Sequence, residues 1–110
     1  MSVIVELSIF PMDKGISVAA YVARAVQIIE EGGLAFALNP MGTCIEGEWE
    51  EVMEVVHRCF KALQKDSDRI YLTLKADYRK GPSGRLQRKV AAVQEKLSTG
   101  KGAGRAQSLA

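Results

Sequence analysis

Residues 34–48, LAFALNPMGTCIEGE, hold two short apolar runs on either side of a turn sequence. The first run spans residues 34–38, and the second begins at Thr43. Between them, residues 39–42 (NPMG) supply Asn, Pro and Gly, which are typical of tight turns. Because so few residues separate the two runs, we expect them to pair as the antiparallel strands of a hairpin, 34–38 and 43–48.

A strand and a helix are predicted on each side of this hairpin. Residues 3–10 alternate as a strand does, and the wholly apolar face carries Val3, Val5, Leu7 and Ile9. A helix is expected from Ser17, as its N-cap, to Gly32–Gly33, where it ends. A second helix is expected to begin near Glu48, and residues 69–79, RIYLTLKADYR, form the clearest strand of the chain.

The order of these elements predicts the fold class. It describes an α+β fold, the ferredoxin-like βαββαβ sandwich, in which two helices cover one face of a four-stranded antiparallel sheet. Residues 85–97, RLQRKVAAVQEKL, add an amphipathic C-terminal helix. The domain is expected to span residues 1–97, and residues 98–110, rich in Gly, Ser and Ala, are expected to form a disordered basic tail.

The uncovered face of the sheet is predicted to be partly apolar. We expect it to carry Ile4, Ser8, Phe10, Tyr71 and Thr73, together with Leu34, Phe36 and Leu38. Ala35 and Ala37 would then face the helices. Because a monomer seldom exposes so large an apolar patch, a second copy is expected to cover it in a homodimer or homotetramer.

The polar residues of the sheet admit two interpretations. In the first, they form hydrogen bonds across a dimer or reach solvent at its rim. These residues are Glu6, Ser8, Thr43, Glu46, Thr73 and Lys75. In the second, some of them line a small pocket for a polar or cationic ligand. Residue types and spacing alone leave both interpretations open and do not name a ligand.

Composition and motifs indicate a protein without catalytic chemistry. Of the 110 residues, 47% are hydrophobic and 25% are charged, as in an ordinary single domain, and no apolar run has the length of a transmembrane helix. Cys44 and Cys59 lack metal-ligand spacing and are expected to be reduced, buried thiols of a cytoplasmic protein. His57 has no predicted nucleophile beside it. We therefore expect no enzyme activity, no cofactor and no metal.

The charge is uneven along the chain. Residues 79–110 carry eight Lys or Arg and one Glu, whereas residues 1–78 carry seven Lys or Arg and twelve Asp or Glu. The basic segment allows an alternative function, a ferredoxin-like nucleic-acid-binding or oligomeric effector-sensing domain. However, the aromatic signature of RNA-binding sheets is missing and a charged helix face is often only solvated, so nucleic acid is not the expected partner.

Three segments resemble the small thiamine-binding protein family, the single-domain relatives of YkoF-like proteins. They are FPMDKGISVAAYVARAV (10–26), LNPMGTCIEGEWEEV (38–52) and RIYLTLKADYRKG (69–81). The motif PMGTxIEGE, followed later by KxDxR, is fairly specific to that family, and the resemblance covers residues 3 to about 97. It implies a ferredoxin-like fold, dimers that pair into tetramers, and binding of thiamine or its hydroxymethylpyrimidine moiety without catalysis.

The resemblance also implies a ligand site, which we expect on the open sheet face near the subunit interface. Five of the expected residues match family motifs: Pro11, Met41, Thr43, Glu46 and Arg79. Ser8 and Leu38 complete the expected site as a polar and an apolar neighbour. The Thr43 hydroxyl can donate or accept a hydrogen bond, and the Glu46 carboxylate is expected to meet the pyrimidine amine or the positive thiazolium.

Thr43 and Glu46 are three positions apart, which places their side chains on opposite faces of a regular strand. Both can serve one pocket only if the strand contains a bulge or ends at Ile45. The alternative for Glu46 is structural: its carboxylate would satisfy amides at the N-terminus of the helix that begins near Glu48.

Overall fold

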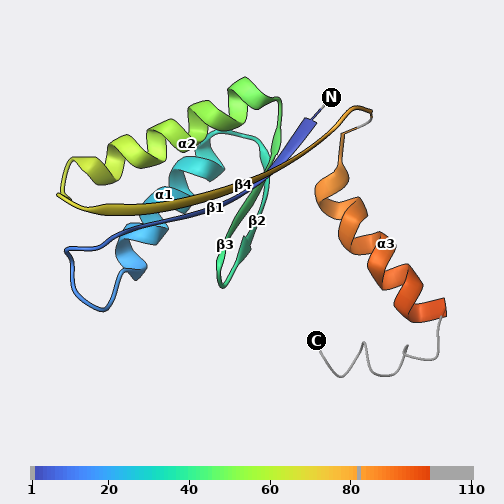
Figure 1. Ribbon diagram of the computed structural model, residues 1–110, viewed down its shortest axis with the longest axis horizontal. Coiled ribbons are helices and arrows are strands. Elements are labelled where there is room, and N and C mark those ends of the chain that lie inside the picture. Colours follow the sequence, from blue (N-terminus) through green and yellow to red (C-terminus); the bar gives the residue numbers. More distant parts are fainter. Residues whose placement is uncertain (1, 82, 100–110) are drawn as a thin grey trace.

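The computed structural model describes residues 2–81 and 83–99. Its elements in chain order are β1 (Ser2–Pro11), α1 (Ala19–Glu31), β2 (Ala35–Asn39), β3 (Gly42–Gly47), α2 (Trp49–Gln64), β4 (Ile70–Arg79) and α3 (Arg85–Thr99). The strands lie in the order β2-β3-β1-β4, and every neighbouring pair is antiparallel (Figure 1). The expected ferredoxin-like α+β sandwich with an added C-terminal helix is therefore confirmed.

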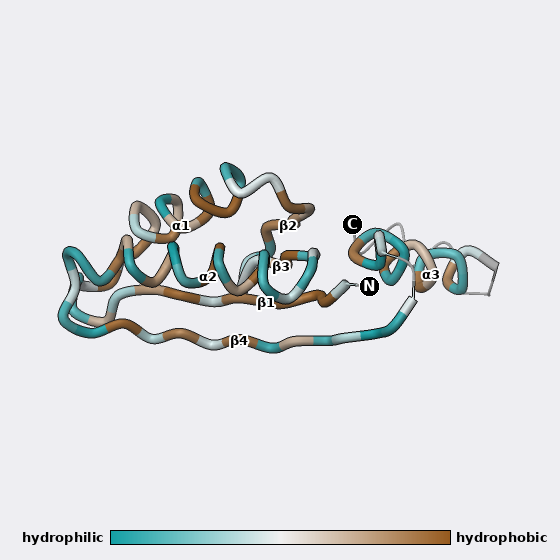
Figure 2. The backbone as a smooth tube through the Cα atoms, turned by 90° about the horizontal axis from the view of Figure 1, so that it is seen from above, coloured by the Kyte–Doolittle hydropathy of each residue, from teal (hydrophilic) through white to brown (hydrophobic). Residues whose placement is uncertain are grey.

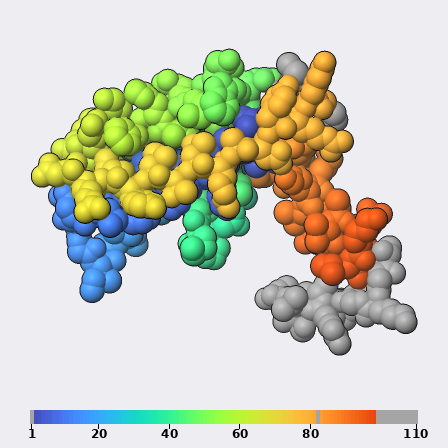
Figure 3. All heavy atoms as spheres, viewed as in Figure 1, coloured from blue at the N-terminus to red at the C-terminus, as the bar shows by residue number. Residues whose placement is uncertain are grey.

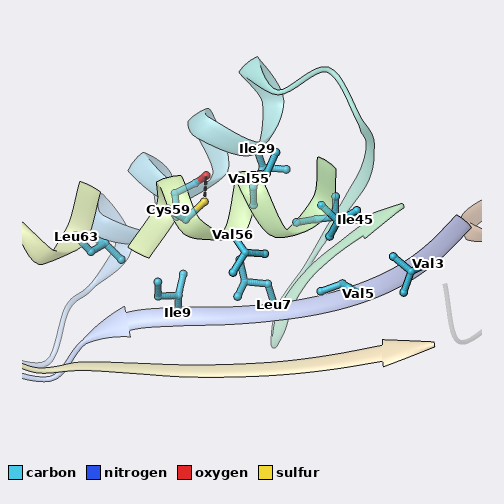
Figure 4. Packing of buried hydrophobic residues seen from close by; sticks show 12 residues of the cluster. Val3, Val5, Leu7, Ile9, Ile29, Ile45, Val55, Val56, Cys59 and Leu63 are labelled. Atoms are coloured by element: carbon cyan, nitrogen blue, oxygen red, sulfur yellow. Dashed lines mark hydrogen bonds between the residues drawn. The ribbon is translucent and has the colours of Figure 1, made fainter. Parts of the chain in front are cut away.

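The core lies between the sheet and two helices. Figure 2 shows α1 and α2 on the same side of β1 and β4. The apolar face of β1 supplies the base of the core, and α1 and α2 supply its cover through the buried residues Ala25, Ile29, Val52, Val55, Val56, Cys59 and Leu63 (Figure 4). Full burial of a Val, Leu or Ile side chain contributes about 1.5–3 kcal/mol. Alternating polarity in β1 thus fixes which sheet face the helices cover.

The side chains of β2 face the opposite way from our expectation. Phe36 pairs with Ile45, which is fully buried, and Leu34 and Phe36 pack against the core. Ala35 and Ala37 therefore lie on the open face, so the predicted placement of the large β2 residues on that face is wrong. The reason is register: Ile45 pairs with the core residue Val5, and a strand's faces follow those of its hydrogen-bonded neighbour.

The helix bounds differ from expectation at the start of α1 and at the end of α3. The structure begins α1 at Ala19 with Val18 as its N-cap, and no side chain caps it, so the expected capping by Ser17 is wrong. The Val18 carbonyl accepts the amides of Tyr21 and Val22 instead. At the other end, Gly32 is the C-cap and the following glycine has a φ of +77°, a conformation that other residues rarely adopt.

Helix α3 projects from the two-layer body, as the space-filling view shows (Figure 3). It lies against β2 and β3, and its first residue, Arg85, also donates to the carbonyls of Ser2 in β1 and Asp77 in β4. Its apolar stripe is largely exposed at Val90, Val93 and Leu97. The helix continues to Thr99, two residues beyond the expected end of the domain, and residues 100–110 of the expected tail lie outside the described residues.

Candidate functional site

A small cavity lies beneath the β2–β3 hairpin, between α1 and the C-terminal half of β1. Its volume is about 280 Å³. Most of its lining is apolar and comes from β1, α1 and the hairpin, and it includes Leu7, Ile9, Val18, Val22, Val26, Leu38 and Met41. Polar lining residues are few: Ser8, Asn39 and Thr43. The cavity therefore suits a small, mainly apolar group that makes one or two hydrogen bonds.

Thr43 is the buried polar residue of this cavity. It pairs with Leu7, so its side chain lies on the sheet face that the helices cover. The residue is 5% exposed, but its hydroxyl is not among the fully buried polar atoms of residues 2–81 and 83–99 that lack a hydrogen-bond partner. A hydroxyl can both donate and accept a hydrogen bond. A ligand or water in the cavity would therefore find a hydrogen-bonding group at Thr43.

Leu38 and Met41 stand at the rim of the cavity. The two-residue turn between Asn39 and Gly42 places them beside Thr43, and they are 61% and 84% exposed. Exposure of two large apolar side chains at a cavity mouth is unfavourable in water. Both side chains would bury apolar area by closing over a bound ring.

Four of the seven residues predicted for the site come together here: Ser8, Leu38, Met41 and Thr43 all line the cavity. The other three do not line it. Pro11 is buried at the end of β1 opposite Ile70. Arg79 lies at the other end of the sheet, where it pairs with Ser2.

Glu46 lies on the other sheet face from Thr43, because β3 is regular and pairs Glu46 with Ile4. The residue is 5% exposed, and its carboxylate accepts hydrogen bonds from Ser2 Oγ at 2.8 Å, the Arg85 amide at 3.0 Å and the Leu86 amide at 3.2 Å. It therefore caps the N-terminus of α3. The structural alternative for Glu46, in which its carboxylate binds amides at a helix N-terminus, is therefore right about the role but wrong about the helix. The amides belong to α3 and not to α2.

The hydrogen bonds to Glu46 govern its ionisation. Burial by itself raises the pKa of this carboxyl, but the hydrogen bonds from Ser2 and from the amides of Arg85 and Leu86 outweigh burial and leave the pKa below its ordinary value. The positive end of the α3 dipole favours the same charged form. Glu46 is consequently an ionised, fully engaged group that fastens α3 to the sheet.

Sequence reasoning missed the contribution of α1 to the cavity. The helical spacing of Val18, Val22 and Val26 predicts that all three belong to the buried stripe of the helix, but the structure places them in the cavity lining. All three are half-buried. Spacing alone does not separate a stripe that fills the core from one that borders a cavity.

The fold and the cavity define a ferredoxin-like protein with a small apolar chamber beneath its hairpin. Residues 5–94 match the model of the thiamine-binding protein family, and the chain belongs to that family. In residues 2–81 and 83–99, no helix is long and apolar enough to cross a bilayer. The same residues contain no group of three His, Cys, Asp or Glu side chains placed to hold a metal ion.

Relatives cover nearly the whole described chain. The UPF0045 protein MJ1052 of Methanocaldococcus jannaschii is 34% identical over 93 residues, covering 84% of this chain and 93% of that protein. A UPF0045 protein of Mycobacterium bovis is 36% identical over 98 residues, covering 88% of this chain and 96% of that protein.

Solved structures share the fold. The crystal structure of the Methanocaldococcus jannaschii protein superposes with a TM-score of 0.79 at 34% identity, covering 86% of this chain and 97% of that one. A Thermotoga maritima protein, provisionally assigned to thiamine biosynthesis or salvage, superposes with a TM-score of 0.75 at 27% identity, covering 84% and 99%.

Proposed function

We propose that this protein is a non-catalytic binding protein for thiamine or its hydroxymethylpyrimidine moiety, with the pyrimidine ring in the cavity beside Thr43. The observation that carries the proposal is the position of Thr43, a largely buried polar residue, in the lining of an apolar cavity of a thiamine-binding family member. This cavity lies on the helix-covered side of the sheet. We therefore place the ring there and not on the open face that the sequence analysis expected.

The size and lining of the cavity support a single ring. Its volume of about 280 Å³ is near the lower end of the roughly 300–1,000 Å³ found for ligand pockets. Apolar side chains from α1 and β1 would face the two sides of the ring, and the Thr43 hydroxyl would bind a ring nitrogen or the exocyclic amine. The thiazolium would remain at the mouth, near Leu38 and Met41.

The charge of the cavity lining predicts the relative affinities of the two candidate ligands. None of the described residues that line the cavity is charged. The positive thiazolium therefore gains no ion pair there, and hydroxymethylpyrimidine should bind within about tenfold of thiamine. The lining also includes no Asp, Glu, His, Lys or Cys that would serve as a general acid or base, which supports binding without catalysis.

Calorimetric titration with thiamine and hydroxymethylpyrimidine tests the proposal. Thr43→Val keeps the side-chain shape and removes the hydroxyl, so affinity should fall about twofold to a hundredfold, the value of one hydrogen bond of about 0.5–3 kcal/mol. Thr73→Val on exposed β4 is the matched control and should bind as the wild type does. Equal affinities for all three proteins, or no binding of either compound at millimolar concentration, would contradict the proposal.

A further inference from the structure

A second cavity, of about 450 Å³, lies between the end of β4 and α3, and its lining is strongly basic. The lining residues are Asp77, Arg79, Lys80, Arg85, Arg88, Lys89 and Ala92. Five of these side chains are cationic and one is anionic. Such an excess of positive charge in a hollow attracts anions.

Arg85 is the buried cation of this cavity, at 7% exposed. Its Nη2 donates to the carbonyls of Ser2 at 3.2 Å and Asp77 at 3.0 Å, and its Nη1 lies 3.6 Å from the Asp77 carboxylate. Its Nε is buried and finds no acceptor among the described residues. Because buried donors are nearly always satisfied, this orphan N–H points to an acceptor that residues 2–81 and 83–99 do not supply.

The remaining cations are only partly neutralised. Lys89 forms an ion pair with Asp77 at 2.5 Å, and Arg88 donates to the carbonyl of Ser83. Arg79 lies near enough to Asp77 to lower the pKa of that carboxyl, but within residues 2–81 and 83–99 neither the Arg79 nor the Lys80 side chain forms an ion pair or hydrogen bond at contact distance. One carboxylate thus faces several cationic groups, and the uncompensated charge suits a dianion.

We propose that this cavity binds a phosphate group, either inorganic phosphate or the monoester of a small molecule. A phosphate presents several strong acceptors to donors that approach from different directions, which matches the guanidinium and ammonium groups of β4 and α3. The orphan Nε of Arg85 would receive one oxygen, and Arg79 and Lys80 would meet the exposed oxygens.

The phosphate site is separate from the Thr43 cavity. Arg85 holds the first residue of β1, whereas the Thr43 cavity contacts β1 near Ser8. At about 3.3 Å per residue, these positions are roughly 20 Å apart along the strand. A phosphate bound here is therefore a second ligand of the same chain, and it would strengthen the attachment of α3 to the sheet.

Thermal unfolding of the full chain in sodium phosphate, compared with sodium chloride at equal ionic strength, is the first measurement. A phosphate that binds only the folded protein stabilises it by RT ln(1 + L/Kd), where L is the phosphate concentration, so the melting temperature should rise steadily with phosphate concentration. Arg79→Gln/Lys80→Gln should weaken phosphate binding at least tenfold. Lys61→Gln/Lys65→Gln, at the opposite end of the molecule on α2, removes the same charge and should keep the wild-type response (Figure 1).

Amide chemical shifts then locate the site. Phosphate should move the signals of Arg85, Arg88 and Lys89 and leave those of Val22 and Thr43 unchanged. Glycerol 1-phosphate distinguishes the sources: equal affinity for both probes assigns the site to free phosphate, and tighter binding of the monoester assigns it to a phosphorylated small molecule. Equal responses of wild type to phosphate and chloride, or equal losses in the two double variants, would overturn the proposal. So would binding of a short RNA with a steep salt dependence while inorganic phosphate does not bind.

Discussion

A single carboxylate, Glu46, ties α3 to the sheet across 39 positions of sequence. Glu46→Gln leaves a neutral group that accepts more weakly and turns an NH₂ donor toward amides that also donate. It should lower stability by about 1–3 kcal/mol, and the melting temperature by several degrees. Thermal unfolding measures the change, with Glu54→Gln, half of an exposed pair with Arg58, as the near-neutral control. Thiamine affinity should not change, because Glu46 does not line the Thr43 cavity. A large loss of affinity with unchanged melting would show that Glu46 contacts ligand.

The lowered pKa of Glu46 makes its contribution to stability depend on pH. The hydrogen bonds hold its pKa in the folded protein below the value of about 4.3 for an unfolded Glu. A lowered pKa adds stability that is fully present above the unfolded pKa and is lost as pH falls through the folded pKa. The stability difference between wild type and Glu46→Gln should therefore be constant near neutral pH and shrink below about pH 4. Melting curves of both proteins from pH 7 to pH 3 test this, and a gap that widens in acid would refute it.

The two free cysteines should react at very different rates. Burial raises the pKa of Cys59 to about 11, and its sulfur donates to the Ala25 carbonyl at 3.5 Å (Figure 4). At pH 8 only about one Cys59 in a thousand is then a thiolate, which is the reactive form. Cys44 is half-buried on β3, and burial raises its pKa as well. Alkylation followed by mass spectrometry should modify Cys44 first, and Cys59 only as fast as the protein unfolds. Equal rates in the folded protein would contradict the burial of Cys59.

At the scale of the element, the sequence predicted strands and helices well where polarity repeats along one segment. Alternation identified β1 and β4, and the short turn identified the hairpin. The sequence failed on β2 because both of its faces are apolar, so the choice between them depends on Ile45 of the neighbouring strand. Four cavity residues were predicted, but the closure of the cavity by α1 and the capping of α3 by Glu46 both depend on contacts between distant segments. No local pattern encodes such contacts.

At the scale of the whole molecule, the exposed apolar surface still favours assembly. Phe10 and Tyr71 stack on the open sheet face with ring centroids 5.7 Å apart, Tyr71 is 54% exposed, and β4 is an edge strand. We expect a homodimer or homotetramer, and sedimentation at micromolar concentration should give the mass of two or four chains. Tyr71→Glu should shift the protein toward monomer, because it places a charge in an apolar contact. His57→Glu, at an exposed position of α2, is the control and should not change the mass. A monomeric wild type would contradict the expectation.

The central position of β1 has a consequence for how the protein is made. Ser2 pairs with Arg79, so β1 is synthesised well before β4, its partner at one edge. At about 5–20 residues per second, translation leaves β1 without its β4 partner for roughly 4–15 seconds. The other edge of β1 pairs with β3, which is made earlier, so only the edge that binds β4 stays open for the whole of that time. An apolar strand with an open edge is prone to aggregation. The nascent chain should therefore bind chaperones through β1 and complete its sheet only after β4 has emerged.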